Sequence, residues 1–150
     1  MIYVPALLIG ITAGLRAMTP LAAVSWGAYL GWIDLSATPA AFLGNIIAVI
    51  IITFLAIGEL VTDQLPNTPS RKVPMQFGAR VVLGALTGAL LMPASWIIGA
   101  LLAATGAVIG TYAGAKVRAR LAKSFGRDLP AALIEDVIAI VLAFVVVSMA

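Results

Sequence analysis

The chain has 150 residues, of which 63% are hydrophobic and 10% are charged. Soluble domains are only about half apolar, so this composition excludes an ordinary soluble domain and predicts one integral membrane domain over residues 1–150. The sequence has no cysteine and no histidine, which excludes disulfides, thiol nucleophiles and the commonest general base.

Six apolar segments predict an all-α membrane protein. They run at about residues 2–15, 21–33, 41–62, 78–92, 95–115 and 131–149. A helix needs about 20 residues to cross the hydrocarbon core of a bilayer, so the first, second and fourth segments are short. The first two either span the membrane thinly or together form a re-entrant hairpin, and the sequence leaves both alternatives open.

The basic residues predict the orientation in the membrane. All nine lie in or beside the first, third and fifth breaks between segments, at Arg16, then Arg71, Lys72 and Arg80, then Lys116, Arg118, Arg120, Lys123 and Arg127. Successive breaks alternate sides, so these residues share one side. The positive-inside rule makes that side cytoplasmic in a bacterial inner membrane and both termini external. This rule also explains the net charge of +3 without a nucleic-acid partner.

Two glycine pairs suggest an internal repeat. Gly10 and Gly14 precede a Met-Thr-Pro sequence, as Gly84 and Gly88 precede Met-Pro. Each pair opens a group of three segments, and the predicted topology runs the two groups in opposite directions. Residues 1–66 and 78–150 would then form a 3+3 inverted-topology repeat, as in many transporters. Coincidence among common residues explains the likeness equally well.

The same glycines predict close helix packing. Small residues four apart let helix backbones approach each other in lipid, and the positions are Gly10, Gly14, Gly84, Gly88, Gly106, Gly110 and Gly114. The Gly106–Gly114 stripe would pack helices within one subunit or form the face of a homo-oligomer.

Charged residues at the predicted cytoplasmic level form the candidate site. Its members are Arg16, Arg71 and Arg80, proposed to bind an anionic substrate, and Glu59, Asp63, Glu135 and Asp136, proposed to couple protons or bind ions. Ionisable groups in or near a membrane span are costly and usually face one another or an aqueous cavity. We therefore expect Arg16, Glu59, Asp63, Arg80, Glu135 and Asp136 to line one polar cavity. The alternative is a purely structural set of ion pairs. The bases at 116–127 are interpreted as orientation signals that contact anionic lipids.

The stretch Gly58–Arg71, together with Gly14-Leu15-Arg16 and Glu135-Asp136, resembles a family of small bacterial membrane proteins, domain of unknown function 4126. The resemblance covers nearly the whole chain. It implies a protein with several membrane spans and a prokaryotic source, and it supplies no activity.

Three classes of function fit these observations. The one we favour is a small transporter, channel or flippase for an anionic or lipid-like, phosphate-bearing substrate. The second is a membrane-embedded, magnesium-dependent enzyme acting on a lipid phosphate, and the third is a structural or accessory subunit. No organic cofactor is predicted, and a divalent cation at the carboxylates is left open.

Overall fold

The computed structural model describes residues 3–65 and 68–150, which fold as a bundle of α-helices without a strand in these two ranges. The α-helices are α1 (Val4–Leu15), α2 (Met18–Tyr29), α3 (Ile46–Thr62), α4 (Pro74–Leu91), α5 (Trp96–Phe125) and α6 (Asp128–Ser148). Two short 3₁₀ helices, η1 (Ala41–Gly44) and η2 (Pro93–Ser95), precede α3 and α5. The predicted all-α fold is confirmed.

Within the described residues, three helical segments are long and apolar enough to cross a membrane: α4, α5 with the turn before it, and α6. At 1.5 Å per residue, the 21 residues of α6 reach about 31 Å, whereas the 12 residues of α1 reach only about 18 Å. The apolar helices α1 and α3 are shorter, with 12 and 17 residues, and are not counted among these three.

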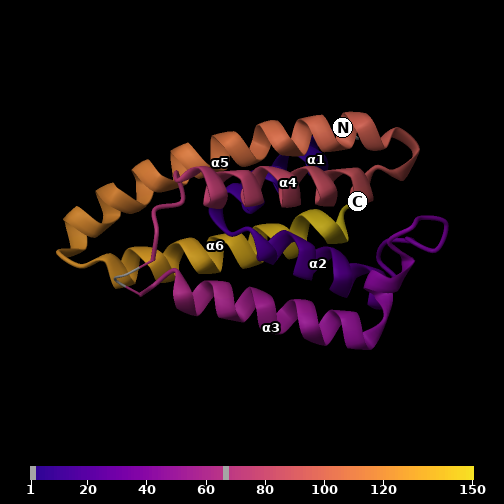
Figure 1. Ribbon diagram of the computed structural model, residues 1–150, viewed down its shortest axis with the longest axis horizontal. Helices are drawn as coiled ribbons and strands as arrows, with labels where there is room; N and C mark the ends of the chain where they lie inside the picture. The colour runs from indigo at the N-terminus through magenta and orange to yellow at the C-terminus, as the bar shows by residue number, and fades with distance from the viewer. Residues whose placement is uncertain (1–2, 66–67) are drawn as a thin grey trace.

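The first two helices form a hairpin. Helix α1 enters the bundle from the end where the chain begins, and α2 returns to that same end (Figure 1). Pro20 explains the break, because its ring would clash with the carbonyl of Arg16, four residues earlier, in a continuous helix. Arg16 accordingly leaves the helical conformation, with φ −141° and ψ 119°. The two helices are antiparallel, and whether they span the membrane thinly or form a re-entrant hairpin stays a prediction.

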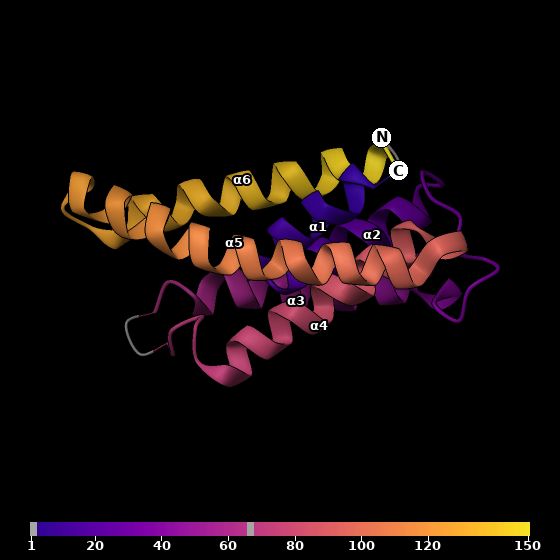
Figure 2. The ribbon, with the colours of Figure 1, turned by 90° about the horizontal axis from the view of Figure 1, so that it is seen from above.

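The connections sort to opposite ends of the bundle. The start of α1, the α2–α3 connection, the α4–α5 turn and the end of α6 lie at one end, and the α3–α4 and α5–α6 connections lie at the other (Figures 1 and 2). This is the alternation that the basic residues predict. The assignment of the second end to the cytoplasm remains a prediction.

Three helices are longer than predicted: α4, α5 and α6, the last of which begins at Asp128 instead of residue 131. Helix α4 begins at Pro74 instead of residue 78, because proline is well tolerated in the first turn of a helix. Helix α5 continues from the predicted end at residue 115 to Phe125, and Gly126, with φ +68°, ends it. Lysine, arginine and alanine favour helix, so the polar stretch after residue 115 continues α5 and most of its bases lie on a helix.

The glycines lie where helix backbones nearly touch. An added Cβ at Gly10 or Gly88 would overlap the backbone of α5, and one at Gly110 would overlap the carbonyl oxygen of Ile11 on α1. Gly14 and Gly106 have the same kind of backbone contact, whereas an added Cβ at Gly84 would lie 3.0 Å from the Ala107 side chain and one at Gly114 would meet the Leu15 side chain. The Gly106–Gly114 stripe packs against α1 of the same chain, so this stripe is not a free face for a second copy.

The two halves of the proposed repeat differ in helix length. Helices α1, α2 and α3 have 12, 12 and 17 residues, whereas α4, α5 and α6 have 18, 30 and 21. What the halves share is that α1 and α4 both pack on α5 through their glycine pairs. The inverted repeat stays a prediction.

Candidate functional site

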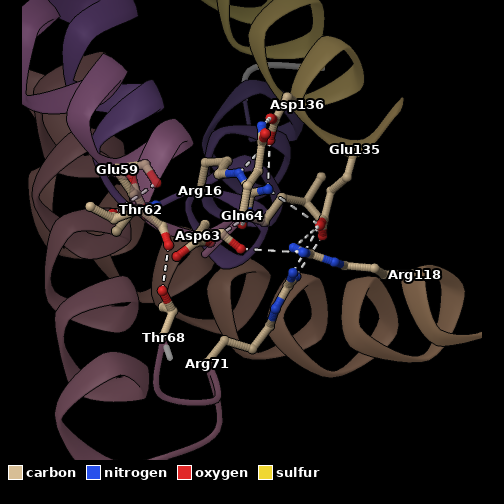
Figure 3. Close-up of polar contacts among 12 residues, drawn as sticks. Arg16, Glu59, Thr62, Asp63, Gln64, Thr68, Arg71, Arg118, Glu135 and Asp136 are labelled. Carbon is tan, nitrogen blue, oxygen red and sulfur yellow. Dashed lines mark hydrogen bonds and ion pairs between the residues drawn. The ribbon is translucent and has the colours of Figure 1, made fainter. Parts of the chain in front are cut away.

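A buried ionic network surrounds the break between α1 and α2, and Arg16 is at its centre (Figure 3). The Arg16 side chain is 0% exposed. Its Nη1 donates to Asp63 Oδ2 at 2.5 Å, and its Nε donates to Asp136 Oδ1 at 2.6 Å. Asp63 follows the end of α3 and Asp136 lies on α6, so one guanidinium joins the hairpin to two other helices.

Glu59 on α3 closes the start of α2. Its two carboxylate oxygens accept hydrogen bonds from the backbone N–H groups of Ala17 and Met18, both at 2.7 Å. The first N–H groups of a helix have no partner within the helix and carry partial positive charge. The carboxylate therefore satisfies and neutralises the N-terminus of α2 inside the bundle.

Arg80 on α4 binds the backbone carbonyl groups at the end of α1, as Glu59 binds the backbone N–H groups at the start of α2. Its Nη1 donates to the carbonyl oxygens of Gly14 and Leu15 at 3.2 and 2.7 Å, and the side chain is 1% exposed. Its Nη2 also lies 3.7 Å from Glu59 Oε1 and 3.5 Å from Asp63 Oδ2. Arg80 and Glu59 thus lie on either side of the helix break and pair with each other. Together they supply the hydrogen-bond partners that the backbone groups freed by the break need in an apolar setting.

A second cluster lies nearer the α3–α4 connection, where two arginines share one carboxylate (Figure 3). Arg71 donates to both oxygens of Glu135, with Nη1–Oε1 at 2.5 Å and Nη2–Oε2 at 2.8 Å. Arg118 Nη1 reaches Glu135 Oε2 at 3.4 Å, and the rest of its guanidinium forms a two-point pair with Asp128 at 3.0 and 2.5 Å. Glu135 Oε2 also lies 3.7 Å from Arg16 Nη2, so the two clusters are joined.

Two cavities adjoin this second cluster. A polar cavity of about 500 Å³ is lined by the α3–α4 connection, α5 and the start of α6, and its charged lining residues are Asp63, Arg71, Arg118 and Asp128. A smaller apolar groove between α1, α5 and α6 includes Glu135 and Arg118 in its lining.

The predicted site residues form one connected network but do not line one cavity. Among the expected residues, Asp63 and Arg71 line the polar cavity and Glu135 lines the apolar groove. Arg16, Glu59, Arg80 and Asp136 line neither. The expectation of a single cavity is therefore corrected: four of these groups are used to hold the helix break and to join helices.

The family model described as Domain of unknown function (DUF4126) matches residues 4–150. The chain belongs to this family. No curated protein and no solved structure matches it. The DUF4126 match spans both clusters and every α-helix of the bundle.

The carboxylates of this DUF4126 chain are each paired with a cation or with backbone. Among residues 3–65 and 68–150, no group of three or more histidine, cysteine, aspartate or glutamate side chains is arranged to hold a metal ion. Glu59 binds backbone amides, Asp63 and Asp136 bind Arg16, and Glu135 binds Arg71.

Sequence reasoning missed three members of this site: Gln64, Arg118 and Asp128, the first residue of α6 and the partner of Arg118. Gln64 donates to Asp136 Oδ2 at 3.1 Å, and it has no sequence signal beyond its place beside Asp63. The sequence pattern predicts Arg118 to be a lipid-contacting base of a loop, whereas it lies on α5 and pairs with Asp128 and Glu135. The spacing of four that joins Gly106, Gly110 and Gly114 continues to residue 118, and on a continuous helix this places Arg118 on the inward face.

Proposed function

We propose that the protein is a small transporter or flippase that moves an anionic, phosphate-bearing substrate through a site centred on Arg71 and Arg118. The observation that supports this most directly is the convergence of both guanidiniums on one carboxylate, Glu135, beside a polar cavity. Guanidinium forks match carboxylate and phosphate oxygens with the same two-point geometry. A phosphate entering the cavity would meet donors that already hold an anion.

Glu135 is the anion that an incoming substrate would replace at the arginines, and transport needs such an exchange. Its side chain is 7% exposed, and Arg71 holds both of its oxygens. An anionic group that takes these donors leaves Glu135 beside Arg16, which already has Asp63 and Asp136 as partners. The released carboxylate is then an acceptor for a proton or another cation, so substrate binding and coupling involve the same residue.

The broken helix is the second feature that supports transport. Transporters commonly bind substrates where discontinuous helices expose their ends inside the membrane. In this chain the hairpin ends are held by side chains from α3 and α4, through Glu59 and Arg80. An inverted repeat, as predicted from the sequence, is a further feature of many transporters. The contacts at the break are side-chain contacts between separate helices, which a rocking motion can remake.

Reconstituted vesicles test the proposal. Phosphatidylcholine vesicles containing the protein would be assayed for uptake of radiolabelled inorganic phosphate and for movement of a fluorescent phosphatidic acid between leaflets, with fluorescent phosphatidylcholine as a neutral-headgroup comparison. We expect one phosphate-bearing probe to move faster than in protein-free vesicles. Charged hydrogen bonds contribute about 1.5–3 kcal/mol, so Arg71→Gln should slow this movement by about tenfold or more.

Arg120→Gln is the matched control, because it removes the same charge from an exposed position of α5. The proposal fails if no phosphate-bearing probe moves above the protein-free rate. It also fails if Arg71→Gln and Arg118→Gln leave the rate at the Arg120→Gln level, which would assign the network to structure alone.

A further inference from the structure

An apolar groove of about 230 Å³ lies between α1, α5 and α6. Its aliphatic lining comes from all three helices and includes Ile11, Leu15, Ile109, Val117, Ile134 and Ile138. Arg118 and Glu135 are its charged lining residues, so it is a hydrocarbon surface that reaches an ion pair.

The groove opens on the outside of the bundle. Val117 is 52% exposed, and Ile138, across the groove on α6, is 51% exposed. In a membrane these side chains face lipid, so a hydrocarbon chain can reach the groove from the side without crossing an aqueous phase.

Arg118 connects this groove with the polar cavity, because it lines both. Gly114 lines the groove beside this cluster, and an added Cβ there would lie 2.5 Å from Leu15 Cδ2, 3.1 Å from Glu135 Oε1 and 3.2 Å from Arg71 Nη1. The absence of a side chain at this position lets the apolar groove reach the two arginines. A molecule that fits both compartments has a hydrocarbon chain and an anionic group at its end.

We propose that the substrate is a phosphate-bearing lipid whose hydrocarbon chain lies in the α1–α5–α6 groove and whose phosphate binds Arg118 and Arg71. This inference rests on the proposed function and names its substrate class. A soluble phosphate would use only the polar cavity and would leave the groove without a role. The exposed bases Lys116 and Lys123 on the same end of α5 favour an anionic headgroup near the groove.

Binding of dodecyl phosphate to the detergent-solubilised full chain tests the inference, with inorganic phosphate and dodecanol as the other probes. We expect dodecyl phosphate to bind at least about tenfold more tightly than either, because only it fills both compartments. Arg118→Gln should weaken this binding by about tenfold or more, with Arg120→Gln as its control. Arg118→Lys, which keeps the charge, should recover part of the loss.

The groove has its own pair of variants. Ile138→Trp places a large side chain in the groove, whereas Val137→Trp places it on the neighbouring position of α6, which is 61% exposed and outside the groove lining. We expect Ile138→Trp to weaken dodecyl phosphate binding by about tenfold or more and to leave inorganic phosphate binding unchanged. Val137→Trp should change neither, and its melting temperature checks that tryptophan on α6 is tolerated.

The outcomes separate this inference from the proposed function. Equal binding of inorganic phosphate and dodecyl phosphate, with no effect of Ile138→Trp, would overturn the lipid inference and leave transport of a soluble anion standing. If binding depends on the hydrocarbon chain of the probe and on Arg118 while no probe moves in vesicles, this result would overturn transport and support the lipid site. Dodecyl phosphate binding that is insensitive to both Arg118→Gln and Ile138→Trp would overturn the proposed lipid site.

Discussion

Arg16 in the α1–α2 break and Asp136 on α6 form a buried ion pair across 120 residues of sequence. Asp136 Oδ1 lies 2.6 Å from Arg16 Nε and 2.5 Å from Arg16 Nη2. The pair joins the hairpin to α6 inside the bundle. Sequence analysis assigned Arg16 to substrate binding. In the structure the Arg16 guanidinium also holds the hairpin against α6, through its buried pair with Asp136.

Arg16→Ala should destabilise the protein severely. The change leaves Asp63 and Asp136 buried without their guanidinium, and breaking a buried pair in this way costs about 3–5 kcal/mol. Thermal unfolding in detergent measures the loss, with Arg120→Ala as the control for removal of an exposed arginine. We expect Arg16→Lys to lose less, because it keeps the charge. Equal melting temperatures for Arg16→Ala and Arg120→Ala would contradict the structural role.

Glu59→Gln should weaken the hairpin through its helix cap. The substitution removes one of the two oxygens that accept from Ala17 and Met18, and it removes the charge that balances the helix N-terminus and Arg80. Hydrogen bonds to charged groups contribute about 1.5–3 kcal/mol, so we expect a loss of that size in unfolding free energy. Asp34→Asn in the exposed α2–α3 connection is the control. A loss no larger than that of Asp34→Asn would show that the cap contributes little.

Much of this arrangement is predictable from the sequence. The apolar segments locate the helices, because the length of an apolar stretch can be read directly from the sequence. Breaks with and without basic residues alternate along the chain, and this alternation predicts the two ends of the bundle. Pro20 and the short first segments favour a break at Arg16. Gly110 and its neighbours identify the contacts of α5, although their spacing does not say which helix they meet.

The partners of the charged residues are not predictable in the same way. Glu59 and Asp63 are four apart and project from one helix face, yet Glu59 binds backbone and Asp63 binds Arg16. Whether a carboxylate meets a guanidinium or a helix end depends on the tilt and depth of each helix. Arg118 illustrates the other limit, because its role appears only when α5 continues past the predicted loop boundary.

Gly110→Leu should destabilise the α1–α5 contact. Any side chain at this position overlaps the carbonyl oxygen of Ile11, which is backbone and cannot move aside alone. Overpacking typically costs about 1–3 kcal/mol, measurable as a lower unfolding temperature. Gly58→Ala on α3 is a matched control with open space around its added Cβ, and it should be neutral or stabilising by about 0.5–1 kcal/mol. A stable Gly110→Leu variant would place this face of α5 away from α1.

Single cysteines should sort into two groups according to the end of the bundle on which they lie. The natural sequence has no cysteine, so each introduced thiol reports one position. Positions 70 and 123 belong to the end formed by the α3–α4 and α5–α6 connections, and position 36 belongs to the end of the α2–α3 connection. The positive-inside rule places the first pair in the cytoplasm. We therefore expect a membrane-impermeant maleimide to label Ser36→Cys in intact cells and to label Ser70→Cys and Lys123→Cys only after permeabilisation. Labelling of all three in intact cells would contradict the alternation of spans, and labelling of Ser70→Cys and Lys123→Cys alone would reverse the orientation while leaving the fold intact.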